Sequence, residues 1–144
     1  MLEQDTIKLL RECDAGVKMG ISSIDETLDC VNNQSLKQNL INCKEQHEDL
    51  RGEIETLLNK YHDNGKEPAV MAKGMSWLKT NIMIAANQSD ATIADLITDG
   101  CNMGVKSLNR YLNQYEAADE MSKDIAKRLI NIEEKLAVDI RQFL

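Results

Sequence analysis

The histidines are the first residues to consider for chemistry, because an imidazole can bind a metal ion or move a proton near neutral pH. The chain has two, His47 and His62. A dinuclear metal centre inside a helical bundle takes a Glu from each of two helices and a Glu-x-x-His motif from each of the other two. Lys44 lies three residues before His47, and Asn59 lies three before His62, so neither histidine belongs to such a motif. The sequence lacks the ligand set of a dinuclear centre, and we expect a protein without catalytic activity of its own.

His47 remains a candidate because it lies on an apolar stripe, halfway along a predicted helix. At the same height of the neighbouring helices we expect Asp14, Cys101 and Glu133. With His47 as the anchor, these side chains could hold a single divalent metal ion. The alternative is a core histidine that is hydrogen-bonded to a carboxylate or to a backbone carbonyl, which is all that a buried imidazole needs. No second ligand lies three or four residues after His47 on its own helix, which favours the alternative.

The four cysteines, Cys13, Cys30, Cys43 and Cys101, form no Cys-x-x-Cys pair, which argues against a zinc ribbon and against a thioredoxin-type motif. Cys43 lies one helical turn before His47, and this spacing could lower the pKa of the thiol. A catalytic dyad also needs an oxyanion donor and an open cleft, which a tightly packed helix position does not offer. We therefore expect four reduced thiols, most of them small core residues.

Apolar residues recur at steps of three and four over most of the chain, and this spacing predicts amphipathic helices. The first stripe covers residues 5–31, and the link Asn32–Gln34 is short enough for an antiparallel hairpin. Ser35, followed by Gln38 at capping-box spacing, predicts the start of the second helix. The second stripe has no gap and consists of Leu36, Leu40, Cys43, His47, Leu50, Ile54, Leu57 and Tyr61.

Residues 62–68 form the strongest break, with the only Pro of the chain and with Gly65, which we expect to cap the second helix. A shorter helix is predicted from Ala69 to about Ala86. A further break follows, with Ser89 or Asp90 as the N-cap of a helix over 91–115, and the last helix covers 121–143. The predicted inner faces of these two helices are Ile93, Ile97, Gly100, Gly104, Leu108, Tyr111 and Tyr115, and then Met121, Ile125, Leu129, Ile132, Leu136, Ile140 and Phe143.

Two hairpins of long helices joined by a long link predict an all-α, ferritin-like four-helix bundle with a shorter crossover helix between helices 2 and 3. The link is long enough to return along the whole bundle, which a simple up-and-down order would not need. The 144 residues fit one domain, over 1–144, and the 3% of aromatic residues argues against a β-rich fold.

The net charge of −7 restricts the possible partners. A nucleic-acid-binding protein needs a cationic surface, and no Lys/Arg run supplies one here. The same deficit argues against binding to an anionic membrane surface. No segment approaches the roughly 18 consecutive apolar residues of a membrane span, and the N-terminal residues do not resemble a signal peptide. We therefore expect a cytoplasmic protein.

The sequence also resembles a known family. The run AKGMSWLKTNI at 72–82 and the run DATIADLITDGCNMGVKSLNRYLNQY at 90–115 are similar to a family of uncharacterised bacterial ferritin-like four-helix-bundle proteins, a domain of unknown function. The resemblance implies the ferritin-like fold and no established activity. Relatives tend to carry an acidic residue directly after the glycine that corresponds to Gly104, where this chain has Val105.

The sequence thus favours a non-catalytic interaction module or stress-associated structural module without a cofactor. A homodimer or a protein partner could use the predicted helix over 69–87, which carries Met71, Met75, Met83 and Trp77. The alternative is a metal-binding ferritin-like protein with a mononuclear or degenerate site anchored by His47. A third hypothesis is a binder of apolar ligands that uses the same methionine-lined helix.

Overall fold

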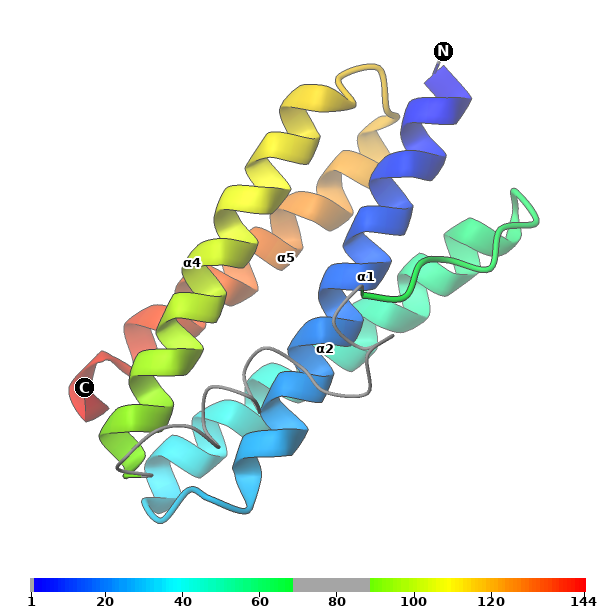
Figure 1. The fold of residues 1–144 in the computed structure, drawn as a ribbon. Coiled ribbons are helices and arrows are strands. Elements are labelled where there is room, and N and C mark those ends of the chain that lie inside the picture. Colours follow the sequence, from blue (N-terminus) through cyan, green and yellow to red (C-terminus); the bar gives the residue numbers. More distant parts are fainter. Residues whose placement is uncertain (1, 69–88) are drawn as a thin grey trace.

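The computed structural model describes residues 2–68 and 89–144, and these residues form helices and contain no β-strand (Figure 1). The long α-helices among them are α1 (Leu2–Leu28), α2 (Gln34–Asn59), α4 (Asp90–Gln114) and α5 (Glu120–Asp139), and a short 3-10 helix, η2 (Arg141–Phe143), follows α5. The all-α prediction is confirmed. The predicted helix over 69–87 lies outside the described residues. In the part of the chain that is described, no helix has the length and apolar character needed to cross a bilayer.

The helices are arranged as two hairpins side by side: α1 packs on α2, α4 packs on α5, and α5 also contacts both α1 and α2 (Figure 1). α4 begins next to the α1–α2 turn, because the Asp90 carboxylate accepts hydrogen bonds from the backbone N–H groups of Asn32 (2.8 Å) and Asn33 (2.9 Å). α2 begins at this same end, so α2 and α4 run in the same direction. The chain between α2 and α4 therefore connects opposite ends of the bundle, as expected from the long link in the sequence.

The apolar stripes form two buried clusters, and most predicted inner positions lie in them. Two expectations were wrong. Leu58 rather than Leu57 is fully buried near the end of α2, and Met121 is 57% exposed because α5 turns Ser122 inward instead. The first cluster includes Leu9, Leu10, Val17, Leu50, Ile54, Leu108, Ile125 and Leu129. The second cluster includes Ile24, Leu36, Leu40, Ile93, Ile97, Cys101, Leu136 and Ile140.

Three helices start at a side-chain cap, which satisfies backbone N–H groups that have no partner inside the helix. Ser89 caps α4, as the sequence predicts, and Asp119 caps α5. The cap of α2 is Asn33, whose side-chain oxygen accepts from the N–H groups of Ser35 and Leu36. The prediction that this helix starts at Ser35 was therefore wrong, because the cap lies two residues earlier, at Asn33.

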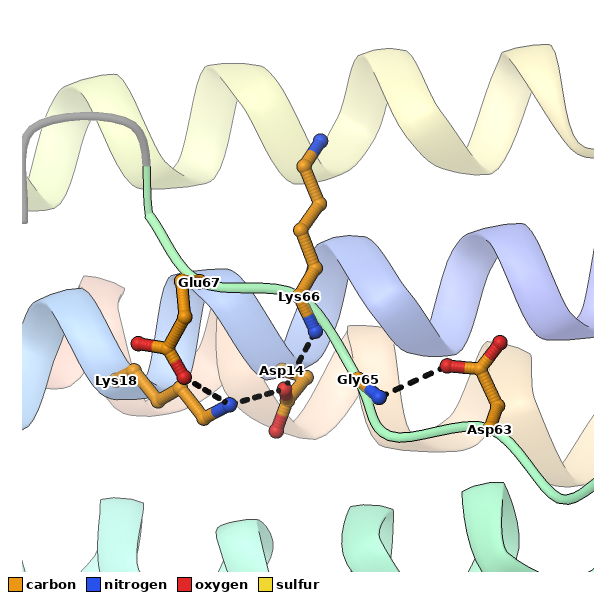
Figure 2. Close-up of polar contacts among 6 residues, drawn as sticks. All are labelled: Asp14, Lys18, Asp63, Gly65, Lys66 and Glu67. Carbon is orange, nitrogen blue, oxygen red and sulfur yellow. Dashed lines mark hydrogen bonds and ion pairs between the residues drawn. The ribbon is translucent and has the colours of Figure 1, made fainter. Parts of the chain in front are cut away.

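The segment after α2 is fastened to α1 by a polar cluster around Asp14, which Figure 2 shows. The buried Asp14 carboxylate accepts from the ammonium of Lys18 (2.7 Å) and from the backbone N–H of Lys66 (3.0 Å). Lys18 also pairs with Glu67 (2.9 Å). These contacts direct the chain along α1 after the helix has ended.

Gly65 does not cap α2, which ends at Asn59, and this corrects the prediction from the sequence. It lies within the polar cluster and has a φ of +84°, in the left-handed region that favours glycine. A Cβ atom added at Gly65 would lie 2.2 Å from Oδ2 of Asp14. The glycine is therefore required both by the backbone and by the carboxylate that it covers.

We predict that Gly65→Ala lowers the free energy of unfolding by about 1–3 kcal/mol, because alanine is strained at a positive φ and its methyl group would displace Asp14. The matched control is Gly52→Ala. Gly52 lies inside α2 with open space where a Cβ would stand, so alanine should raise stability by up to about 1 kcal/mol. Urea unfolding followed by circular dichroism measures both. Equal stability of the two variants would contradict the interpretation of Gly65.

Candidate functional site

His47 is the polar residue at the centre of the bundle, on α2 between Cys43 and Leu50 of the buried stripe. Its side chain is 1% exposed. One ring nitrogen, Nδ1, lies 2.8 Å from the backbone carbonyl oxygen of Cys43, and the other, Nε2, lies 2.9 Å from Oε1 of Glu133 on α5. Both partners are acceptors. The surroundings therefore fit an imidazolium that donates one N–H on each side.

The charge state of His47 follows from competing effects. Burial lowers the pKa of the imidazole, since it disfavours the charged form. Hydrogen bonds to Cys43 and Glu133, together with the negative charge of Glu133, outweigh burial and raise the pKa to about 10. At neutral pH, His47 and Glu133 therefore form a buried ion pair that joins α2 to α5.

The two thiols nearest to His47 belong to Cys43 and Cys101, and neither is placed to act with the histidine as a nucleophile. Burial raises the pKa of Cys101, and the charge of Glu133 and a hydrogen bond to it raise the pKa further. Cys43 Sγ lies 3.5 Å from His47 Nδ1, but that nitrogen already donates to the Cys43 carbonyl. Because the Cys43 carbonyl oxygen occupies Nδ1 and the thiol is buried, the geometry does not support a Cys43–His47 dyad.

The structure brings together three of the four residues proposed as metal ligands from the sequence. His47 contacts Glu133, and Cys101 is hydrogen-bonded to Glu133. Asp14 lies elsewhere: it is six positions before Gly20, the residue of α1 that faces His47, which is about 9 Å along the helix.

A metal ion does not fit this arrangement well. Within 2–68 and 89–144, no group of three or more His, Cys, Asp or Glu side chains is placed to hold one. With both nitrogens of His47 donating, the ring also has no lone pair for a metal. The core-histidine alternative, by contrast, needed a carboxylate or a backbone carbonyl as the partner of the ring, and His47 has one of each.

Gly20 makes room for the imidazole, and the sequence did not single it out. A Cβ atom there would lie 2.6 Å from both Nε2 and Cδ2 of His47. Only a glycine lets α1 pass so close to the ring. On α4, Gly104 faces Glu133 at ordinary contact distance, whereas no atom of the described residues lies within 4 Å of where a Cβ at Gly100 would be. Of these two glycines, both predicted on the inner face of their helix, only Gly104 is therefore packed against a described neighbouring helix.

A pocket of about 380 Å³ lies between α1 and α4, and the ion pair of His47 and Glu133 forms part of its wall. We call it the α1–α4 pocket. Its volume is within the range of small-molecule sites. It is lined on α1 by Glu12, Ala15, Gly16, Met19, Gly20, Ser23 and Ile24, on α4 by Leu96, Ile97, Gly100, Cys101, Met103, Gly104, Ser107, Leu108 and Tyr111, and elsewhere by His47, Lys66, Pro68, Leu129, Glu133 and Leu136.

The charged groups of the pocket occur at two positions, and the hydroxyl groups of Ser23 and Ser107 also line it. The ion pair of His47 and Glu133 is one. At the Glu12 end, the Lys66 ammonium pairs with the Glu12 carboxylate, and this hydrogen bond raises the pKa of Lys66. Burial and the nearby Glu12 raise the pKa of Tyr111. The remaining wall is mainly apolar side chains and glycine, as is usual for sites that bind small apolar molecules.

Comparisons with protein-family models, with curated proteins and with solved structures found no match to this chain. The resemblance to the bacterial ferritin-like family therefore stays a prediction from the runs at 72–82 and 90–115. The candidate site is defined by its own geometry.

We predict that the protein loses stability as the pH rises. A folded pKa raised from 6.5 to about 10 stabilises the fold fully below pH 6.5, and this contribution is lost as the pH rises toward 10. One proton changes the free energy of unfolding by up to about 1.4 kcal/mol per pH unit. Urea unfolding between pH 6 and 8, where thiols titrate little, measures the slope.

The control for this slope is Glu133→Gln, which keeps an acceptor for His47 but removes the negative charge that raises its pKa. Its stability should depend less on pH over the same interval. Parallel pH profiles for the two proteins would show that His47 is not charged in the fold.

We also predict that the thiols differ in reactivity. Burial raises the pKa of Cys13 to about 12 and also raises that of Cys101, so neither forms the reactive thiolate near neutral pH. Cys30 is half-buried at the start of the α1–α2 turn. Iodoacetamide at pH 8, followed by mass spectrometry, should modify Cys30 first in the native protein and all four cysteines in urea. Faster native labelling of Cys13 or Cys101 would contradict this order.

Proposed function

We propose that this chain is a non-catalytic helical-bundle protein that acts by binding, and that it holds a small, mainly apolar molecule in the α1–α4 pocket. The observation that carries this proposal is the pocket itself: about 380 Å³ with apolar and glycine walls and a polar pair at its base. Few precisely placed polar groups in a mainly apolar cavity are typical of ligand sites.

The state of the polar side chains supports a role without catalysis. His47 is protonated and bonded at both nitrogens, and Glu133 is its counter-ion. The Cys101 thiol is protonated near neutral pH. The described part of the pocket therefore presents no free base or nucleophile of the kind that acyl transfer or proton abstraction needs.

Several expectations from the sequence remain proposals beside this one. The parallel directions of α2 and α4 support a ferritin-like order of helices. A homodimer or a protein partner would use residues 69–87, outside the described residues. A cytoplasmic location stays a prediction. For a mononuclear metal site, no observation adds support to the sequence pattern.

We predict that the neutral fluorescent dye Nile red binds the protein and that Gly100→Leu weakens this binding at least about tenfold. Gly100 lines the pocket, and no atom of the described residues lies within 4 Å of where its Cβ would be, so we expect the leucine side chain to enter the cavity. The matched control is Gly52→Leu, at the other helical glycine with open space, on the exposed side of α2. Both substitutions favour the helix by about 0.5–1 kcal/mol, so only the pocket distinguishes them.

Fluorescence titration with each protein gives the dissociation constants. Equal affinity of the two variants would place the dye elsewhere, and no binding by the unmodified protein would contradict the proposed function. If Gly100→Leu also destabilised the fold while Gly52→Leu did not, the space beside Gly100 would be filled by the protein itself.

A further inference from the structure

The shape of the α1–α4 pocket restricts the ligand that fits. On α1 the lining extends from Glu12 to Ile24, about 18 Å at 1.5 Å per residue, which is about twice the diameter of a sphere of 380 Å³. On α4 it extends from Leu96 to Tyr111, a similar length. The pocket is therefore an elongated slot between two helices, and a long, thin molecule fills it better than a compact one.

The charges along the slot are already balanced. Lys66 pairs with Glu12, and His47 pairs with Glu133. An anionic ligand would meet two carboxylates and no cation that lacks a partner among the described lining residues. A cationic ligand would have to compete with the Lys66 ammonium or the buried imidazolium. An uncharged ligand avoids both costs, since a charge taken out of water needs a partner of its own.

Glu133 is the group best placed to orient such a ligand. Its carboxylate accepts from His47 and from the Cys101 thiol, and a carboxylate has about four acceptor positions, so some are not used by these two bonds. Its second oxygen, Oε2, lies opposite Gly104, where the absence of a side chain leaves the slot open. A hydroxyl or amide N–H in the slot can therefore donate to Glu133.

We propose that the ligand is an elongated, uncharged alkyl chain that carries a hydroxyl or amide N–H, and that this group donates to Glu133 while the chain extends along the glycine-lined slot. This inference rests on the proposed binding function of the same pocket. It names the class of molecule: long-chain alcohols and amides rather than fatty acids or compact ring systems.

The test is displacement of Nile red at pH 7 by four compounds of nearly equal size. n-Decanol has the expected shape and a donor, methyl nonyl ether lacks the donor, decanoate carries a charge, and adamantanol is compact. Because a hydrogen bond to a charged group is worth about 1.5–3 kcal/mol, decanol should bind at least about tenfold tighter than the ether. Decanoate and adamantanol should also bind more weakly than decanol.

Glu133→Gln tests the orienting residue. The advantage of decanol over the ether should shrink in this variant, because a neutral amide is a weaker acceptor than a carboxylate. An unchanged advantage would remove Glu133 from the proposal even if the alcohol binds.

Other outcomes separate this inference from the proposed function. If Nile red binding depends on Gly100 but decanoate or adamantanol displaces the dye as well as decanol does, the pocket binds ligands and the inferred class is wrong. If none of the four compounds displaces the dye, the class is also wrong. If the dye itself does not bind, the proposed function fails and the inference with it.

Discussion

The buried ion pair between His47 and Glu133 is the constraint on which the rest of the bundle depends. It lies between the two apolar clusters, with Leu50 of one cluster and Cys43 of the other on either side of the imidazole along α2. Such a pair adds little stability over well-packed apolar residues of the same size, because removing two charges from water offsets their attraction. Separating them inside the core would be costly, however. The pair therefore fixes the relative height of α2 and α5, and we infer that it sets the register of the two hairpins.

This constraint extends to the helices that do not carry the pair. α1 passes the imidazole at Gly20, where any side chain would collide with the ring, and α4 contributes Cys101 and Gly104 around Glu133. The polar contacts at the two ends of the bundle then hold this alignment, through Asp90 at the α1–α2 turn and through Thr6, which accepts from the backbone N–H of Asp119 at the other end.

The periodic stripes predicted the helices and most of the core, because burying one face of a helix needs only the right spacing of apolar residues. They also predicted that His47 lies in the core of the bundle. The pairing of His47 with Glu133 was harder to predict. Glu133 lies at the edge of the apolar stripe of its helix, and only the rotation of α5 in the bundle brings its side chain inward. Asp14 binds the segment after α2 rather than His47, and this depends on how α1 and α2 are aligned in the bundle. Gly20 beside the ring does not follow from one helix alone, whereas the cap at Asn33 is local, since its side chain accepts from Ser35 and Leu36 of the same helix.

The same glycines explain why the pocket lies beside the ion pair. Each glycine inside a helix costs about 1 kcal/mol relative to alanine, and protein interiors are normally packed without large voids. Gly20 has a structural reason, since it admits the imidazole. Among the described residues, nothing gives Gly16 or Gly100 such a reason: a Cβ at Gly16 would make only ordinary contact with Leu129, and a Cβ at Gly100 would have no described atom within 4 Å. Alanine at either position would fit and would strengthen its helix. We therefore explain Gly16 and Gly100 by the space that they leave open in the α1–α4 pocket rather than by a role in stabilising the fold.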